Sequence, residues 1–402
     1  MAFFLHRTRP VLAVLLPLLL AGCMGTTPSA PTASAPGTAC VPCQCQGCPS
    51  PALPKPEEKP LQPATWSDLP GWGDDDLAAA LDGLLATCRT LEKQARWAKV
   101  CADVRSSNRN DLRAWFEARF EPWALVNPDG RRDGLVTGYY EPVVRGSRDR
   151  HAPYTVPVFG PPDDLIVVDL GTLYPELKTM RLRGRIEGRR LVPYYSRAEW
   201  AEQEARRDSK ALLWLDDPVG FFFLQVQGSG QVELDDGSRV RIGYADQNGY
   251  PYRSIGRWLA DRGEMPLDQT SMPNIKAWAA AHPDRLQELL NANPSLIFFR
   301  ELPLKGEGPP GAMGLPMLPE RSIAVDSRHT PLGAPVWLDT TRPASDIPLR
   351  RLVLAMDTGG AIRGPVRADF YWGSGPEAGA QAGRMRQTGR MWVLLPRGYA
   401  PK

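Results

Sequence analysis

Short strand-like segments, repeatedly interrupted by glycine, proline and aspartate, dominate the chain from Gly134 onward and restrict the folds it can adopt. The 402 residues include 37 Gly and 41 Pro, which are typical of turns between strands. Asp235-Asp236-Gly237 separates two of the segments and predicts a hairpin. Regularly spaced short strands favour a barrel or sandwich over a doubly wound sheet. The expected strands are Leu135 to Tyr140, Leu165 to Asp169, Phe221 to Val226, Val232 to Leu234, Val240 to Tyr244, Ser322 to Val325, Pro335 to Leu338, Leu352 to Met356 and Met391 to Leu395.

Helical periodicity appears before the strands and again between their two groups. Asp74-Asp75-Asp76 can cap the first helix, whose apolar residues follow helical spacing. The stretch from Lys305 to Pro319 is rich in glycine and proline and indicates a boundary or a long loop. We therefore predict a mainly β fold with helical segments. The predicted helices cover Leu77 to Cys88, Trp97 to Val104, Asp111 to Phe120, Ser254 to Ala260 and Ile275 to Leu290.

The N-terminus has the features of an export signal. Basic residues precede an apolar stretch from Val11 to Leu20 that is too short to span a bilayer. Leu20-Ala21-Gly22-Cys23 resembles a bacterial lipobox, which predicts a signal peptide over residues 1–22 and acylation of Cys23. An ordinary secretory signal is the alternative. Met24 in place of aspartate favours the outer membrane, with the protein facing the periplasm.

Residues 23–65 are rich in Pro, Ala, Ser and Thr and predict an extended tether without folded elements. The tether contains a thiol cluster, Cys40, Cys43, Cys45 and Cys48, for which small disulfide loops and a metal site are alternatives. In an oxidising compartment the disulfides are favoured. Cys88 and Cys101 can form a further disulfide if a bend brings them together.

Charge and histidine content exclude several classes of function. With 48 Lys+Arg against 45 Asp+Glu, and no basic block, nucleic acid is not an expected partner. None of the four histidines has a zinc-binding spacing, so we expect neither a catalytic metal nor a cofactor. No Gly-x-Ser-x-Gly surrounds Ser229, which argues against a serine hydrolase using Ser229 and His329.

Three aspartates near the C-terminus each close or follow an expected strand: Asp326, Asp357 and Asp369. Glycine-rich turns beside them would allow close approach of a ligand. Alternatively, the three carboxylates bond the backbone of their own loops, as most loop aspartates do. Position along the chain alone does not separate these interpretations.

The three segments resemble the three-aspartate (3D) domain, most specifically at Asp357-Thr-Gly-Gly-Ala-Ile-Arg-Gly364 and Arg367-Ala-Asp-Phe-Tyr-Trp-Gly373. Upstream, Thr137-Gly-Tyr-Tyr-Glu-Pro142 and Phe223-Leu-Gln-Val-Gln-Gly-Ser-Gly230 resemble the membrane-bound lytic transglycosylase A family. The resemblance implies a double-psi β-barrel domain over residues 66–140 and 303–402. It also implies a second β-rich domain inserted at residues 141–302, with a substrate groove between the two.

The resemblance further implies a peptidoglycan lytic exotransglycosylase, a carbon–oxygen lyase that leaves 1,6-anhydromuramic acid ends. Asp369 matches the family's catalytic aspartate, while Asp326 and Asp357 match the other two. A lone acid can suffice because the sugar's own C6 hydroxyl is the nucleophile. Burial beside Phe370, or a nearby ionised Asp357, would raise the pKa of Asp369.

The glycan strands of peptidoglycan are the expected partner, with outer-membrane lipid bound through Cys23 and cell-wall synthesis enzymes as further candidates. A muramidase hydrolase that uses Asp357 as a second carboxylate remains an alternative. A non-catalytic peptidoglycan-binding lipoprotein is another. The residues expected to line the groove, each with plain packing or a turn as its alternative, are Tyr139, Tyr140, Gln225, Gln227, Ser229, Gly230 and Asn248.

Overall fold

The structure is a computed structural model that describes residues 59–178, 180–204, 210–399 and 401. The expected signal peptide, Cys23 and the cluster from Cys40 to Cys48 lie outside the described residues. Within the described part of the chain, no helix is long and apolar enough to cross a membrane.

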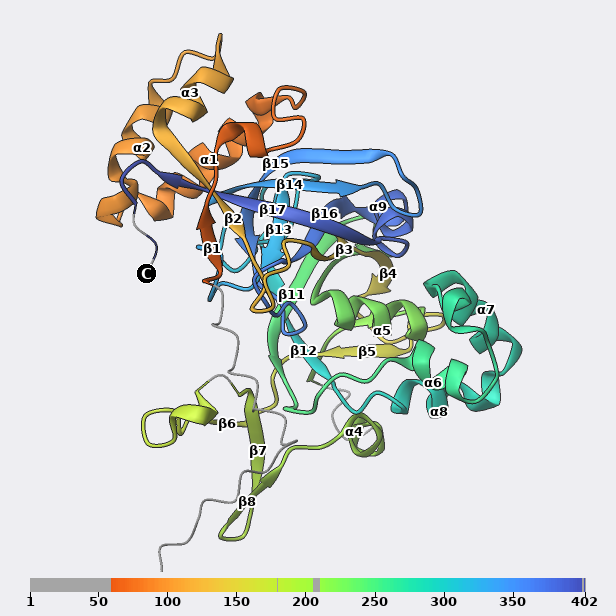
Figure 1. Cartoon of the computed structure of the whole chain (residues 1–402). Helices are drawn as coiled ribbons and strands as arrows, with labels where there is room; N and C mark the ends of the chain where they lie inside the picture. The colour runs from red at the N-terminus through yellow and green to blue at the C-terminus, as the bar shows by residue number, and fades with distance from the viewer. Residues whose placement is uncertain (1–58, 179, 205–209, 400, 402) are drawn as a thin grey trace, which may run out of the picture. The chain divides into compact units, whose positions relative to one another are not determined.

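An eight-stranded sheet combines strands from both ends of the described chain (Figure 1). Its order is β1-β2-β17-β14-β15-β13-β16-β3, and β17 makes an additional pairing with β3. The pairs β13–β15 and β16–β3 are parallel. The strands are β1 (Leu61–Pro63), β2 (Phe120–Leu125), β3 (Gly134–Glu141), β13 (Ser322–Val325), β14 (Pro335–Thr341), β15 (Pro348–Asp357), β16 (Arg367–Ser374) and β17 (Arg386–Pro396).

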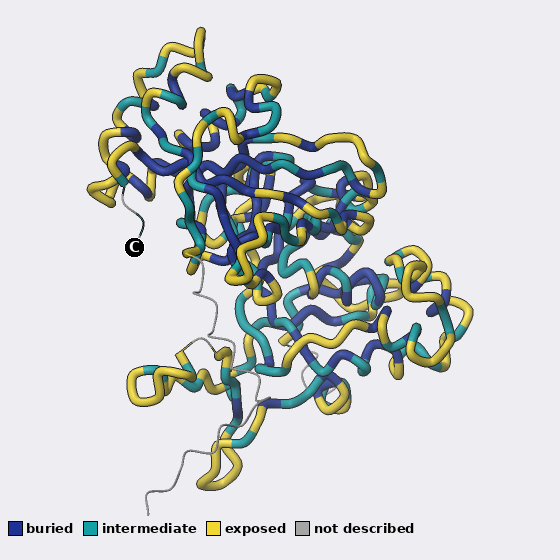
Figure 2. The backbone as a smooth tube through the Cα atoms, viewed as in Figure 1, coloured by how far each residue is buried: buried dark blue, intermediate teal, exposed yellow. Residues whose placement is uncertain are grey.

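Four helices accompany this sheet, and its strands form the most continuously buried part of the chain (Figure 2). As predicted, Asp76 caps the first helix, where its side chain accepts a hydrogen bond from the Ala78 N–H. The possible disulfide between Cys88 and Cys101 is confirmed, and it joins the first two helices. The helices are α1 (Leu77–Leu91), α2 (Ala95–Arg105), α3 (Leu112–Arg119) and α9 (Gly375–Ala382).

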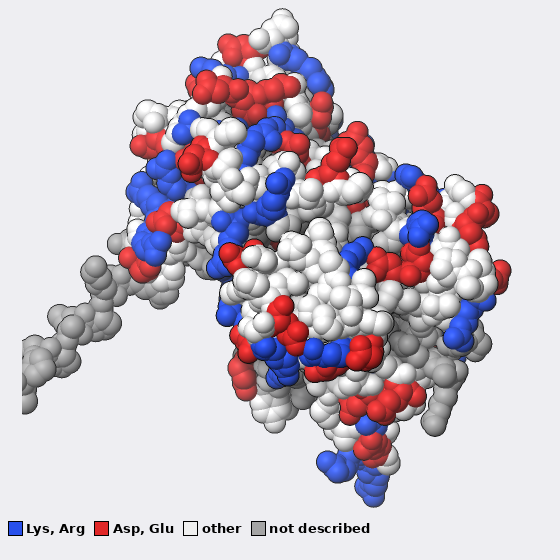
Figure 3. Space-filling view, turned by 90° about the vertical axis from the view of Figure 1, so that its right-hand side faces the viewer, with Lys and Arg blue, Asp and Glu red and all other residues white. Residues whose placement is uncertain are grey.

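The middle of the chain forms a six-stranded sheet in the order β12-β11-β10-β4-β9-β5 and a three-stranded sheet in the order β6-β7-β8. The predicted hairpin at Asp235-Asp236-Gly237 is confirmed between β10 and β11. On the face shown in Figure 3, acidic and basic side chains are interspersed. The strands are β4 (Val143–Ser147), β5 (Val156–Phe159), β6 (Ile166–Val168), β7 (Leu182–Glu187), β8 (Arg190–Pro193), β9 (Ala211–Leu215), β10 (Ser229–Leu234), β11 (Arg239–Gln247) and β12 (Ile297–Leu302). The helices are α4 (Arg197–Glu204), α5 (Pro218–Gln227), α6 (Ile255–Asp261), α7 (Met272–Ala281) and α8 (Leu286–Asn291).

The strand expected from Phe221 to Val226 is wrong, because these residues lie within helix α5. A short, continuous apolar run does not distinguish a buried strand from a buried helix. The ends of the helix are specified locally. The Asp217 side chain accepts a hydrogen bond from the Gly220 N–H, and Pro218 occupies the first turn. Gly228 ends the helix with φ +80, in the left-handed region that favours glycine.

Two further segments differ from expectation. The pattern from Ile275 to Leu290 is two helices, α7 and α8, because Pro283 interrupts it and begins a short 3₁₀ turn. Leu61–Pro63, at the end of the expected tether, forms β1 and pairs with β2. Three residues are too few to show the periodicity of a strand, so the sequence did not predict β1, which forms by pairing with β2.

A buried ion pair links the two larger sheets. Glu141, the last residue of β3, accepts hydrogen bonds from Arg241 of β11 at 2.6 and 3.2 Å. The two side chains are 0% and 2% exposed. Glu141 also accepts from Gln231 of β10 and from Ser374 of β16. The carboxylate therefore joins β3 to strands of both sheets with its oxygens fully engaged.

Candidate active site

The register of the eight-stranded sheet places two of the three aspartates in one row. Strand β13 lies between β15 and β16, and its Ala324 is paired with Asp357 on one side and Asp369 on the other. Asp369 is paired in turn with Thr137 of β3. Residues directly opposite one another point to the same face of a sheet. Asp357, Asp369 and Thr137 therefore share one face.

Two tyrosines form the next row on that face. Tyr371 and Tyr139 are paired, two residues beyond Asp369 and Thr137, and their ring centroids are 5.3 Å apart. The Tyr139 hydroxyl donates to Asp357 Oδ2 at 3.2 Å and also lies 2.9 Å from the sulfur of Met317. Because the periodicity of a strand is two, this face combines carboxylates with aromatic rings.

Asp369 has the environment of a carboxylic acid that retains its proton. Burial raises its pKa, against the opposing effects of the Thr137 hydrogen bond and the Arg367 charge. The side chain is half-buried, so some solvent access remains although protein surrounds it. The Thr137 hydroxyl donates to Asp369 Oδ1 at 2.6 Å, and Arg367 Nη2 donates to Thr137 Oγ1 at 2.9 Å.

Asp357 has a related environment, and its protonation depends on that of Asp369. Burial raises the pKa of Asp357, and the charge of Asp369 contributes in the same direction. Hydrogen bonds from the backbone of Thr358 and Ala312 and from the Tyr139 hydroxyl oppose the shift. A charge on one carboxyl group disfavours ionisation of its neighbour, so an ionised Asp369 adds to the effect of burial on Asp357.

Asp326 is different and is unsuited to proton donation. It is 3% exposed, and Arg328 donates to its two oxygens at 2.9 and 2.5 Å. The Gly364 N–H donates a further bond at 2.8 Å. The Arg328 hydrogen bond is the main reason that the pKa of Asp326 lies well below its usual range. Asp326 therefore stays ionised and holds the glycine-rich loop that follows Asp357, as the loop-bonding alternative proposed.

Several of the expected groove residues lie beside the end of β3. The Tyr140 N–H donates to Gln227 Oε1 at 3.1 Å, which joins β3 to the end of α5. Ser229 and Gly230 follow directly in β10. A Cβ on Gly230 would lie 2.5 Å from Leu224 and 3.1 Å from the Pro142 carbonyl. Glycine is needed here for close packing.

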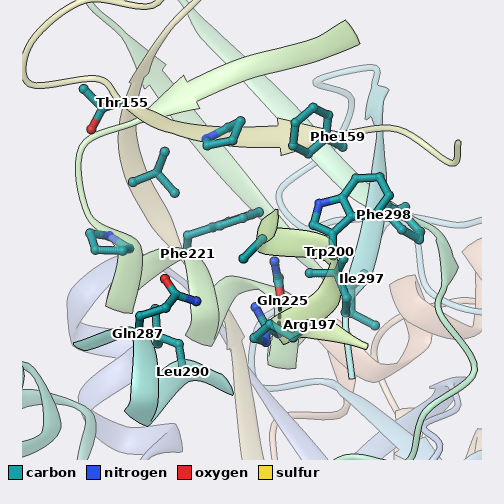
Figure 4. Close-up of a pocket in the computed structure, with 15 residues that line it drawn as sticks. Thr155, Phe159, Arg197, Trp200, Phe221, Gln225, Gln287, Leu290, Ile297 and Phe298 are labelled. Carbon is teal, nitrogen blue, oxygen red and sulfur yellow. Dashed lines mark hydrogen bonds between the residues drawn. The ribbon is translucent and has the colours of Figure 1, made fainter. Parts of the chain in front are cut away.

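The structure does not bring Gln225 and Asn248 into this group. Gln225 is 4% exposed, accepts from Arg197 Nη2 at 2.5 Å, and lines a separate cavity with Phe221 and Trp200 (Figure 4). None of the three aspartates lines that cavity. Asn248 is 1% exposed, and its amide bonds the backbone of Tyr195, Pro294 and Leu296. The Asn248 amide and the Gln225 amide oxygen are therefore hydrogen-bonded within the fold.

Sequence reasoning missed Thr137 and Arg367 as site residues. Both stand inside the motifs quoted above, Thr137 at the start of its segment and Arg367 two residues before Asp369. The two-residue periodicity of a strand could have identified Thr137, because it places Thr137 on the same strand face as Tyr139. The pairing of β3 with β16 could not be predicted from local sequence patterns, because it joins residues 232 positions apart.

Comparison with known proteins identifies the family of the chain. Residues 135–300 match the MltA specific insert domain, and residues 321–395 match the 3D domain. The membrane-bound lytic murein transglycosylase A of Escherichia coli K12 is 32% identical over 294 residues, which cover 71% of this chain and 72% of that protein. The chain belongs to the MltA family.

Solved MltA structures share the fold. MltA from Neisseria gonorrhoeae, in a monoclinic crystal form, is 39% identical with a TM-score of 0.75, over 85% of this chain and 94% of that one. Escherichia coli MltA with bound chitohexaose is 28% identical with a TM-score of 0.62, over 83% and 91%. The 3D match includes Asp326, Asp357 and Asp369, while the MltA insert match includes Thr137 and Tyr139.

Proposed function

We propose that this MltA-family protein is a lytic murein transglycosylase. It cleaves the β-1,4 bond between N-acetylmuramic acid and N-acetylglucosamine and leaves 1,6-anhydromuramic acid ends. The observation that carries the proposal is Asp369, a carboxyl group whose burial raises its pKa, on a sheet face that it shares with Asp357 and Tyr139. The binding of chitohexaose, a β-1,4 glycan, by the Escherichia coli relative supports the substrate class.

The reaction needs one proton carrier. Protonated Asp369 donates to the bridging oxygen as the bond from C1 to that oxygen breaks. The C6 hydroxyl of the same muramic acid then attacks C1, and Asp369 removes its proton as the new C1–O6 bond forms. Because the nucleophile belongs to the substrate, its effective concentration is high and water is not consumed. Asp357, oriented by the Tyr139 hydroxyl, stabilises positive charge that develops at C1.

The domain organisation is part of the proposal. Residues 66–140 and 303–402 form a double-psi β-barrel, and residues 141–302 form the inserted domain. The additional β17–β3 pairing supports closure of the strands into a barrel. The glycan lies in a groove between these two parts. Tyr139, Tyr140, Gln227, Ser229 and Gly230 contribute to that groove.

Product masses from purified sacculi test the function. The wild-type enzyme is expected to release muropeptides that lack one water relative to reducing-end products, with no oxygen from labelled solvent at C1. Reducing termini carrying solvent oxygen would instead identify the muramidase that uses Asp357 as a second carboxylate. Binding to sacculi without release of any soluble muropeptide would identify a non-catalytic lipoprotein.

We also propose that acylated Cys23 anchors the protein to the periplasmic face of the outer membrane. The lipobox and the membrane-bound relatives support this location. Cys23→Ala is expected to move the protein from the membrane pellet to the soluble periplasmic fraction. Cys45→Ala, a cysteine change in the tether, is the matched control and should leave it in the pellet. A Cys23→Ala protein that stays in the outer-membrane fraction would disprove the anchor.

A further inference from the structure

The hydroxyl of Thr137 lies between a cation and the proposed acid. Arg367 Nη2 is 2.9 Å from Thr137 Oγ1, which in turn is 2.6 Å from Asp369 Oδ1. A guanidinium group has donors only, so the Thr137 oxygen accepts from Arg367. Its single hydrogen is then directed at Asp369. The hydrogen bonds therefore run in one direction, from Arg367 through Thr137 to Asp369.

That direction distinguishes the two oxygens of Asp369. Oδ1 is occupied as an acceptor, so a proton on the carboxyl group belongs on Oδ2. We propose that Thr137, held by Arg367, is a positioning residue that keeps the acid proton of Asp369 on Oδ2, the oxygen that faces the glycosidic bond. The proposal rests on the transglycosylase function proposed above and adds to it the oxygen that transfers the proton.

The backbone fixes all three hydrogen-bonded groups. Asp369 and Thr137 are directly paired between the parallel strands β16 and β3. Threonine is branched at Cβ, which restricts the rotation of its hydroxyl about χ1. Arg367 also donates to the backbone carbonyls of Ala368 and Leu135, so its guanidinium is held on β3 as well as on β16. Little reorganisation is therefore needed when the substrate arrives.

The same arrangement serves both halves of the reaction. In the first half, the proton leaves Oδ2 for the glycosidic oxygen and Asp369 becomes a carboxylate. The Thr137 hydrogen bond is then charge-assisted and stronger, which stabilises the enzyme between the two steps. In the second half, Oδ2 takes the proton of the C6 hydroxyl, and the starting state returns with no net change in protons.

Thr137 also sets the acid strength of Asp369. Its hydrogen bond opposes the effect of burial and lowers the pKa of the carboxyl group. Removing the hydroxyl therefore raises the pKa, which makes Asp369 a weaker acid. A threonine that only packs against its neighbours would have no such effect, so the pH dependence separates the two roles.

The test compares Thr137→Val, Thr137→Ser and Thr340→Val on sacculi across pH. Valine keeps the shape of threonine and removes the hydroxyl, so kcat should fall by about 10- to 100-fold, as for loss of a hydrogen bond to a charged group. The activity loss at high pH should move to higher pH. Serine restores the hydroxyl and should recover most of both effects. Thr340, whose hydroxyl bonds the Thr388 carbonyl on other strands, is the matched control and should change neither.

Arg367→Gln provides a second variant if Thr137→Val folds poorly. It frees the Thr137 hydroxyl to rotate and should lower kcat in the same direction, with a smaller further loss when added to Thr137→Val. A valine variant with wild-type kcat, an unmoved high-pH limb, or a loss that serine does not recover would each overturn the proposal. Product masses are recorded in parallel. If the wild-type enzyme forms anhydro products and Thr137→Val is unaffected, only the role of Thr137 is rejected. If the wild-type enzyme forms products with reducing ends, the proposed function itself is rejected.

Discussion

Asp369→Asn is expected to lower turnover of purified sacculi by about 10³-fold or more while the fold stays intact. General acid–base catalysis alone typically contributes about 10²–10⁴-fold, and here one group serves both proton transfers. Asparagine has nearly the same shape, and its carbonyl oxygen can still accept from the Thr137 hydroxyl. The checks are kcat on sacculi and the circular dichroism spectrum of the purified variant.

The stability of the same variant gives an independent check. Burial raises the pKa of Asp369 in the folded protein, so the folded state binds this proton more tightly than the unfolded chain. Its contribution to the free energy of unfolding is complete at low pH and is lost as pH rises through the folded pKa. Asparagine does not titrate. The variant should therefore be at least as stable as wild type at pH 7, with the difference disappearing below about pH 4.

Asp357→Asn is the matched control within the site. Asp357 is also a carboxyl group with a raised pKa, but it transfers no proton in the proposed reaction. We expect a smaller loss of kcat and a change in the pH optimum, because Asp369 then titrates beside Arg367 without the neighbouring Asp357 carboxyl group. Equal loss in both variants, or wild-type turnover in Asp369→Asn, would contradict the assignment of Asp369 as the lone proton carrier.

Arg241→Met is expected to lower the free energy of unfolding by about 3–5 kcal/mol, the usual cost of removing one partner from a buried ion pair. The variant leaves Glu141 at 0% exposure without its cation. Two neutral donors remain, Gln231 and Ser374, and they do not balance a buried charge. Urea denaturation followed by tryptophan fluorescence measures the change.

Two variants define the origin of that loss. Glu141→Gln combined with Arg241→Met should recover much of the stability, since no buried charge is then left unpaired. Arg239→Met is the surface control, because Arg239 lies on the same strand as Arg241, β11, and its ion pair with Glu233 of β10 is exposed, with side chains 52% and 46% accessible. Exposed pairs contribute about 0–1 kcal/mol. A loss in Arg241→Met no greater than in Arg239→Met would show that the buried pair is not a stabilising link.

Much of the fold could be predicted from local sequence signals. Asp76 caps α1 as predicted, and Asp111, the first residue of the third predicted helix, caps α3. Helix α5 was missed because its apolar residues lack amphipathic spacing, although Asp217-Pro218 and Gly228 frame it. Local capping signals were therefore more informative there than the apolar pattern.

The site was predicted less completely, for a physical reason. The quoted motifs contain Asp369 and Asp357, but their environments depend on strand pairing between distant segments. Asp326 matches the same domain, yet Arg328 keeps it ionised. Asn248 and Gln225 were expected to line the groove, but the Asn248 amide and the Gln225 amide oxygen form hydrogen bonds inside the fold. Sequence spacing identifies the strand and the face on which a side chain lies, but not which neighbouring group will form a hydrogen bond with it.

The order of the strands also determines when during synthesis the enzyme can become active. Thr137 is made 232 residues before Asp369, and β3 finds its partner only after β4 to β15 have been made. Such distant pairing forms late in folding. A chain whose last strands have not yet been made therefore lacks the paired Thr137 and Asp369 on which the proposed reaction depends.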